Sequence, residues 1–248
     1  MAILSSTTAG NREHVILLHG LRRSGRSMIP MGHALSQAGY KVLNMDYPSH
    51  TLSIEKLAED AVGRAVGECQ RNSAAKIHFV THSLGGILVR SYLKYHEIPN
   101  LGRVVMLGPP NQGSEVVDKL GSLWLFRLIN GPAGNEMGTD EDSTPSKLGP
   151  AHFCVGIIAG NCSINWINSL LILGSDDGKV SVERTKLVGM TDHIIIRAAH
   201  PFIMRNRTAI RQTIHFLRTG RLNGRRKFDF HGLFKSQSVT SKSFVTQS

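Results

Sequence analysis

The sequence contains few of the features that mark membrane-spanning, disulfide-rich or secreted proteins. No apolar run approaches the roughly 20 residues that a helix needs to cross a bilayer. Three cysteines without CxxC spacing, Cys69, Cys154 and Cys162, favour free thiols, with a Cys154–Cys162 bridge as the alternative. The opening residues MAILSSTTAGNREH have no basic segment followed by an apolar one. We therefore expect a soluble cytoplasmic protein, or a secreted or periplasmic one if a leader has been removed.

Acidic residues are also scarce, and the formal net charge is +11. Such a charge first suggests nucleic acid or an anionic surface as a partner. Residues 221–248 carry +5 of it, however, and the remaining +6 is spread along the body of the chain. No helix-turn-helix, zinc-finger or RNP-like motif accompanies the charge. The sequence therefore predicts a solvated basic tail and no nucleic-acid partner, with weak contact with anionic lipid surfaces as a minor alternative.

Length and apolar content indicate one folded domain of the α/β class. A chain of 248 residues suits one large domain, and 41% hydrophobic residues can fill its core. Short, nearly continuous apolar runs, typical of strands buried on both faces of a parallel sheet, recur along the chain. They are His14–His19, Lys41–Asp46, Lys76–Val80, Arg103–Leu107, Phe153–Ala159 and His193–Ala198.

Segments of helical periodicity lie between these runs. Apolar residues repeat at helical spacing within residues 28–38, 57–65, 84–92 and 210–217. Alternating strands and helices predict a doubly wound parallel sheet. We expect an N-terminal segment at 1–12, the α/β domain at 13–220 with a short cap or excursion at 114–152, and a basic flexible tail at 221–248.

The stretch Phe79–Arg90, FVTHSLGGILVR, joins a predicted strand to a predicted helix through a serine. This pattern is typical of a nucleophile elbow, in which the serine sits on a sharp, strained bend. The positions two before and two after the serine crowd each other, and Gly85 and Gly86 supply the small residues that this requires. The pattern predicts Ser83 as a nucleophile and the N–H of Leu84 as an oxyanion donor. A turn without a catalytic role is the alternative.

A serine nucleophile needs a base, and the base needs an orienting acid. Two carboxylates, Asp176 and Asp177, lie in a predicted turn after the fifth run, and His200 directly follows the last strand. His200 is therefore placed to reach back to Ser83, whereas His193, at the start of that strand, is interpreted as structural. The remaining histidines show no metal-ligand spacing, so we assign no metal ligands.

The first predicted strand ends in a His-Gly pair. Leu21, the next residue, would supply the second oxyanion N–H alongside that of Leu84. The same loop carries Arg22, Arg23 and Arg26, which could steer anionic substrates or interfaces. A solvated basic loop without such a role is the alternative.

Five segments carry a resemblance to a known family. HGLRRSGRSM, THSLGG, LGPPNQGSE, DDGKVSV and HPFIMRN, in this order, resemble the lipase and esterase branch of the α/β-hydrolase family, and within it small bacterial-type relatives of triacylglycerol lipases. The resemblance covers about residues 13–220 and implies a minimal α/β-hydrolase fold, with about six mostly parallel strands flanked by helices. That branch carries its acid in an Asn-Asp-Gly turn, which corresponds here to Asp176-Asp177-Gly178 and implies Asp177 as the acid.

The resemblance also implies an activity. The expected protein is a serine hydrolase that cleaves carboxylic esters through Ser83, His200 and Asp177, with an acyl-enzyme intermediate and no organic cofactor. Its expected partner is a small-molecule or lipid ester, and the apolar island Leu123–Ile129 predicts a preference for short to medium acyl chains unless it packs in the core. Two alternatives stay open: an acyltransferase that uses the same residues, and a non-catalytic binding protein on the same scaffold.

Overall fold

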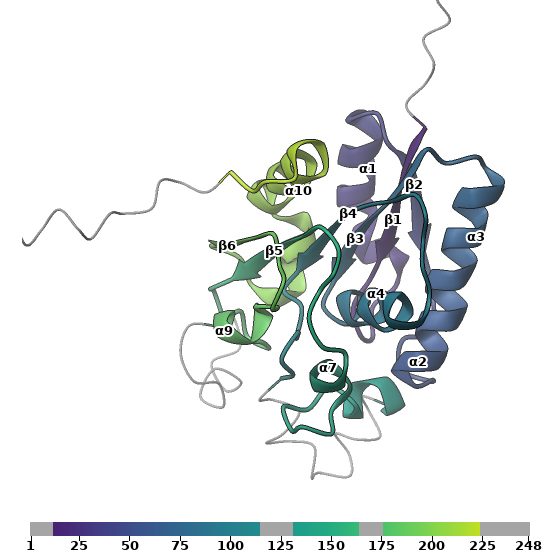
Figure 1. Ribbon diagram of the computed structural model, residues 1–248. Coiled ribbons are helices and arrows are strands. Elements are labelled where there is room, and N and C mark those ends of the chain that lie inside the picture. The colour runs from purple at the N-terminus through teal and green to yellow at the C-terminus, as the bar shows by residue number, and fades with distance from the viewer. Residues whose placement is uncertain (1–11, 115–130, 164–175, 224–248) are drawn as a thin grey trace, which may run out of the picture.

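Six parallel strands form the centre of the molecule. The computed structural model describes residues 12–114, 131–163 and 176–223, and the ribbon is shown in Figure 1. The strands stand in the order β2-β1-β3-β4-β5-β6, and every neighbouring pair is parallel. They are β1 (Glu13–Leu18), β2 (Lys41–Met45), β3 (Lys76–His82), β4 (Leu101–Leu107), β5 (Val155–Gly160) and β6 (Asp192–Ile196). The predicted doubly wound parallel sheet is confirmed.

The helices cover both faces of this sheet (Figure 1). One face carries α2 (Ile54–Leu57), the π-helical segment η2 (Ala58–Val62), α3 (Gly63–Arg71) and α4 (Leu84–Tyr95). The other face carries α1 (Ile29–Gln37), which follows η1 (Gly25–Met28), and α10 (Arg207–Thr219), which follows η3 (His200–Arg205). Two short helices, α7 (Thr144–Lys147) and α9 (Val182–Thr185), lie in the connections beyond the carboxyl ends of the strands.

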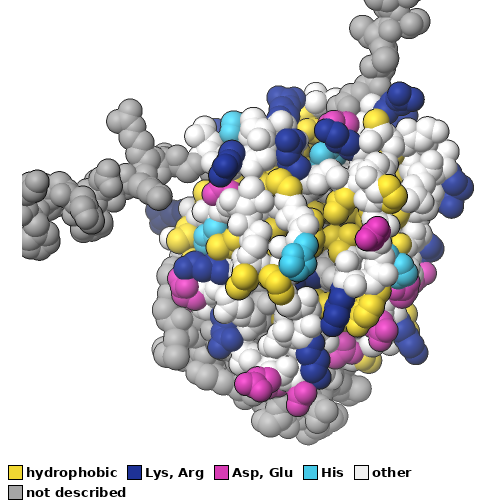
Figure 2. Space-filling model, viewed as in Figure 1, with side chains coloured by type: hydrophobic (Ala, Val, Ile, Leu, Met, Phe, Trp, Pro, Cys, Tyr) yellow, Lys and Arg dark blue, Asp and Glu magenta, His cyan; other side chains and the backbone are white. Residues whose placement is uncertain are grey.

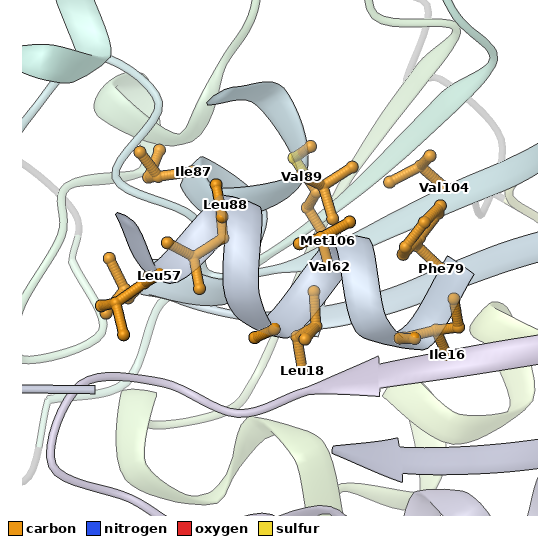
Figure 3. Close-up of a cluster of buried hydrophobic side chains, with 14 of the residues drawn as sticks. Ile16, Leu18, Leu57, Val62, Phe79, Ile87, Leu88, Val89, Val104 and Met106 are labelled. Carbon is orange, nitrogen blue, oxygen red and sulfur yellow. The ribbon is translucent and has the colours of Figure 1, made fainter. Parts of the chain in front are cut away.

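Successive residues of a strand point alternately into two hydrophobic cores, one on each face of the sheet. Ile16 and Leu18 of β1 pack with Phe79 against the α2–α4 layer, as Figure 3 shows. Val15 and Leu17 point to the opposite face and join the α1–α10 layer. Because both faces of the central strands are buried, their sequences read as continuous apolar runs rather than as alternating ones. The strand predictions succeed for this reason.

The parallel arrangement brings distant loops together at one edge of the sheet. The carboxyl ends of β1, β3, β4, β5 and β6 all meet there, so the segments that follow them are neighbours in space. Part of the predicted excursion at 114–152, including Leu123–Ile129, lies outside the described residues, as does most of the predicted tail at 221–248.

No patch of one charge sign dominates the face of the molecule drawn in Figure 2. In Figure 2 the Lys and Arg side chains are spread over that face and lie among Asp and Glu side chains. Of the helices that the structure describes, none combines the length and the apolar character that crossing a bilayer requires.

Candidate active site

Ser83 occupies a strained bend between β3 and α4. Its backbone has φ 51° and ψ −119°, a region that non-glycine residues rarely adopt. Its N–H donates to the carbonyl of Leu107 at 3.0 Å, which fixes the bend to the end of β4. Such strain persists only where the surroundings hold it, and it concentrates at functional sites. The local sequence therefore folds into the sharp strand–turn–helix that the elbow pattern predicts.

Two glycines allow this bend to pack. A Cβ on Gly85 would lie 2.7 Å from the carbonyl oxygen of Leu18, so only glycine lets α4 approach β1 this closely. A Cβ on Gly86 would lie 3.3 Å from Thr81 Oγ1. The Thr81 side chain is fully buried and fits beside Gly86 because that residue has no side chain. A β-branched residue two positions before the serine is thus accommodated.

The structure brings Asp177 and His200 into direct contact. His200 Nδ1 lies 2.7 Å from Asp177 Oδ2, and both side chains are buried. The backbone N–H of His200 also donates to the carbonyl of Asp177 at 2.9 Å, so the two residues are joined twice. Gly108, at the end of β4 with φ +53°, makes room for the pair: a Cβ there would lie 3.0 Å from Asp177 Oδ2. An imidazole held in this way has a fixed tautomer and orientation.

Asp176 and Asp177 have different partners, although they are adjacent. Asp176 Oδ1 accepts the N–H of Gly178 at 2.6 Å, which closes the turn locally. Asp177 Oδ1 accepts the N–H groups of Lys179 and Val180 at 3.1 and 3.0 Å, which leaves Oδ2 for His200. Asp177 is therefore the member of the pair that faces the imidazole.

His82, which sequence reasoning did not assign to the site, connects three parts of it. Its ring is 2% exposed, and its Nε2 donates to the carbonyl of His200 at 3.0 Å. Its Nδ1 has no hydrogen-bond partner among the described residues and lies 2.8 Å from the position of a Cβ on Gly20. Burial, and then the nearby His200, lower the pKa of His82 well below its ordinary value, so the ring is neutral. No local signal in the sequence marks this role.

The loop after β1 lies directly against the nucleophile. A Cβ on Gly20 would lie 3.1 Å from Ser83 Cβ, so the backbone that leads into Leu21 runs beside the elbow. Leu84 opens α4 immediately after Ser83. None of the hydrogen bonds found among the described residues uses the N–H of Leu21 or of Leu84. Both groups are thus available to a ligand, as an oxyanion hole requires.

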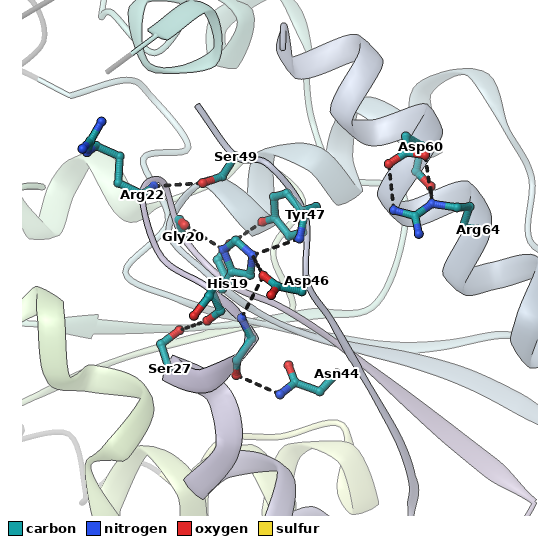
Figure 4. Close-up of polar contacts among 12 residues, drawn as sticks. His19, Gly20, Arg22, Ser27, Asn44, Asp46, Tyr47, Ser49, Asp60 and Arg64 are labelled. Carbon is teal, nitrogen blue, oxygen red and sulfur yellow. Dashed lines mark hydrogen bonds and ion pairs between the residues drawn. The ribbon is translucent and has the colours of Figure 1, made fainter. Parts of the chain in front are cut away.

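Buried contacts from the end of β2 hold this loop, as Figure 4 shows. His19 stacks on Tyr47 with ring centroids 4.0 Å apart, and the Tyr47 hydroxyl donates to the His19 carbonyl. His19 Nδ1 lies 2.9 Å from the Gly20 carbonyl, and the N–H of Arg22 donates to Ser49 Oγ at 2.9 Å. Burial lowers the pKa of His19, so its ring acts as a neutral hydrogen-bonding group. His19 therefore helps to hold this loop in place, in addition to the turn made by Gly20.

One hydrogen bond of the expected triad is not formed in this structure. Among the described residues, Ser83 Oγ makes no hydrogen bond with the His200 ring; catalytic hydrogen bonds are often long without substrate.

His193 lies at the start of β6 and contacts Thr185 Oγ1 at 2.9 Å, away from this cluster. No group of three or more His, Cys, Asp or Glu side chains in the described ranges could hold a metal ion.

Comparison with known proteins agrees with this architecture. A family model described as alpha/beta hydrolase fold matches residues 13–159. A search of curated proteins finds no match. The mature form of the lipase BlEst2 from Bacillus licheniformis is similar in structure, with a TM-score of 0.70 and 20% identity over 84% of this chain and 92% of that one.

Two further solved structures share the fold. Phospholipase PlaB from Legionella pneumophila has a TM-score of 0.68 and 16% identity over 84% of this chain and 60% of that one. A monoacylglycerol lipase from Paleococcus ferrophilus has a TM-score of 0.53 and 17% identity over 84% and 95% of the two chains. At these identities the likeness shows the fold alone, but the family model spans more than half of the chain. The chain belongs to the alpha/beta hydrolase fold family.

Proposed function

We propose that this protein hydrolyses carboxylic esters with Ser83 as nucleophile, His200 as base and Asp177 as the orienting acid. The hydrogen bond between His200 Nδ1 and Asp177 Oδ2, 2.7 Å long and buried, is the observation that carries this proposal. The strained backbone of Ser83 supports it, because the bend presents the hydroxyl at the carboxyl edge of the sheet. The similar structures named as lipases and a phospholipase make an ester the expected substrate.

The chemistry follows from these positions. Ser83 Oγ attacks the acyl carbon while His200 Nε2 takes its proton, and Asp177 stabilises the imidazolium that forms. The N–H groups of Leu21 and Leu84 hold the oxyanion of the tetrahedral intermediate. His200 then gives the proton to the leaving alcohol, and an acyl-Ser83 ester remains. Water, deprotonated by His200, attacks this ester and releases the acid and the free hydroxyl.

The experiment that tests the proposal replaces the nucleophile. We expect Ser83→Ala to reduce hydrolysis of p-nitrophenyl butyrate by at least about 10³-fold, because no other hydroxyl can take the place of Oγ. The urea midpoint should stay within the error of the wild type, since alanine keeps the Ser83 Cβ and, among the described residues, Oγ makes no hydrogen bond with the His200 ring that the variant would lose. A fluorophosphonate probe should label the wild type at Ser83 and leave the variant unlabelled. Wild-type turnover by the variant, or labelling at another serine, would contradict the assignment.

A further inference from the structure

Two loops next to the candidate site each carry a cation, Arg23 and Lys179, whose side chain is open to solvent. Arg23 follows the oxyanion loop, and its N–H donates to the Gly20 carbonyl at 3.2 Å. Lys179 follows the acid, and its N–H donates to Asp177 Oδ1 at 3.1 Å. The two are 156 positions apart in the sequence, yet each backbone is fixed to a member of the site. The backbones of both cations are therefore anchored next to the reacting groups.

Both loops are held in place. The Lys179 carbonyl accepts the hydroxyl of Ser114 at 3.0 Å, and the turn before it is closed by Asp176. The turn that carries Arg23 lies between Gly20, which touches the elbow, and the hydrogen bond from the Arg22 N–H to Ser49. Figure 4 shows the Arg22 side chain directed away from His19 and Tyr47. Because both backbones are fixed, the loops lose little entropy of their own when the side chains bind an anion.

These cations repel each other and lack a matched carboxylate. Burial, and then the charge of Arg23, lower the pKa of Lys179, although the side chain keeps contact with solvent. The charge of Asp177 raises the pKa of Lys179, but the oxygens of Asp177 already accept hydrogen bonds from His200 and two backbone N–H groups. Within the described residues, no ion pair within 4.0 Å includes Arg23 or Lys179. Partly desolvated like charges are unfavourable, and an anion between them would remove that cost.

We propose that Arg23 and Lys179 form a subsite for an anionic group of the substrate, either a carboxylate or a phosphate, next to the ester bond that is cleaved. The proposal rests on the ester hydrolysis proposed above and gives it a substrate class: esters with a negative charge close to the reacting carbonyl. In this proposal the two cations stabilise both the bound anionic substrate and its transition state. Arg26 lies in η1, and the anion subsite does not require it.

Two pairs of substrates that are similar in size and differ in charge test the subsite without dependence on folding. One pair is the p-nitrophenyl monoester of glutaric acid and p-nitrophenyl pentanoate, which places the charge in the acyl part. The other is the butyrate ester of 4-hydroxybenzoate and that of 4-hydroxybenzamide, which places it in the alcohol. The ratio of kcat/KM for the anionic and the neutral member, compared between two proteins, cancels both intrinsic reactivity and any general loss of activity.

We expect the double variant R23Q/K179Q to lower this ratio about tenfold in at least one pair at low ionic strength. Added salt should lower the wild-type ratio toward that of the variant, because the Debye length falls to about 8 Å at physiological ionic strength. R26Q removes one charge from the same loop region and is the matched control, with an unchanged ratio expected. An unchanged ratio in both pairs for R23Q/K179Q would overturn the proposal, as would an equal fall for R26Q.

Two further measurements separate the source of the anion and the dependence on catalysis. Vesicles of phosphatidylglycerol and of phosphatidylcholine with the same acyl chains show whether a lipid headgroup reaches the subsite. A preference for phosphatidylglycerol that R23Q/K179Q removes would identify a lipid headgroup as the anion. A response to R23Q/K179Q with the soluble esters alone would identify a soluble anion. Binding of glutarate and of 4-hydroxybenzoate to the Ser83→Ala protein, measured by calorimetry, needs no turnover. Equal binding of both anions with and without R23Q/K179Q would refute the subsite even if the esterase assignment holds.

Discussion

Asp176 and Asp177 face different partners within one turn, and the proposed mechanism gives them different roles. Asp176 bonds the Gly178 N–H, and Asp177 bonds the His200 ring. We expect Asp177→Asn to lower kcat by several orders of magnitude at neutral pH, since losing the corresponding acid in a serine protease costs about 10⁴-fold. Asp176→Asn should keep most activity, because an asparagine oxygen can accept the same N–H.

The measurement is kcat for a p-nitrophenyl ester, with circular dichroism as a check of the fold. A large loss in Asp176→Asn with little in Asp177→Asn would move the acid by one position. Near-wild-type rates in both single variants would mean that the acid lies elsewhere or that either carboxylate suffices. The double variant distinguishes these two cases.

His82 contacts two neighbours of the candidate site, and we expect it to position them rather than to contact substrate. Its Nε2–H holds the His200 carbonyl, and its ring fills the space that Gly20 leaves open. We expect His82→Gln to keep kcat within a few-fold, because the glutamine amide can donate from about the position of Nε2. His82→Met, similar in size but without a donor, should lower kcat about 10- to 100-fold with little change in KM, since the base is then misplaced.

The contrast between these two variants is the critical observation. A merely structural role for His82 would make both variants lose stability in proportion to their packing, with kcat and KM unaffected in the folded fraction. Equal kcat in both variants at matched folded fractions, determined from urea curves, would refute a positioning role for His82.

At the scale of single residues, the sequence predicts what is encoded locally. Ser83, Gly85 and Gly86 form one short pattern whose steric demands can be read without a structure, and the structure has the strained bend. His82 could not be found in this way, because its partner lies 118 positions further along the chain. The catalytic roles of Leu21, Ser83 and Leu84, and those of Asp177 and His200, stay predictions, although their geometry is now defined.

At the scale of elements, α4 joins the elbow to the loops above it through Arg90. This side chain is 5% exposed, and its guanidinium donates to the carbonyls of Asn111, Pro145 and Gly149 at 2.9 to 3.1 Å. Burial lowers the pKa of Arg90 to about 10. The planar guanidinium donates from two separate nitrogens, Nη1 to Asn111 and Nη2 to Pro145 and Gly149, and the single ammonium nitrogen of a lysine cannot reproduce this geometry.

We expect Arg90→Met to lower the free energy of unfolding by about 2–4 kcal/mol, because buried carbonyls lose charge-assisted hydrogen bonds. Arg90→Lys should recover only part of this loss. Urea denaturation measures the stability, and hydrogen exchange should show the largest loss of protection near residues 145–149. A stability within 0.5 kcal/mol of the wild type, on the order of an ordinary surface substitution, would show that the three carbonyls find other partners.

Element types were predictable where burial controls the pattern. The strands appear as apolar runs, and the repeat of Leu57, Ala61 and Ala65 indicates a helix that the structure extends from Ile54 to Arg71. The π-helical segment Ala58–Val62 within it has no signature in that repeat. Segments whose conformation depends on distant partners, such as the loop that Arg90 anchors, cannot be read from periodicity.

At the scale of the whole molecule, several buried histidines couple stability to pH. His14, His19, His78 and His82 are almost inaccessible to solvent, and His193 is half-buried. Burial is the largest cause of a lowered pKa for each of the five. In the unfolded chain these rings regain a pKa near 6.5. Between the lowered folded values and about 6.5, the unfolded state therefore binds more protons than the native state.

The sign of the pH effect follows from this difference. Stability rises with pH wherever the unfolded state binds more protons, so the contribution of these histidines is present above about pH 6.5 and is lost as pH falls through their folded pKa values. We expect the free energy of unfolding, from urea curves, to decrease steadily from pH 7 to pH 5. His82→Gln removes one of these titrating rings. The slope of the free energy of unfolding against pH should therefore become shallower by up to about 1.4 kcal/mol per pH unit, whatever the stability at pH 7. A slope that is equal in the two proteins would mean that the His82 ring is already protonated in the native state, contrary to its burial beside His200.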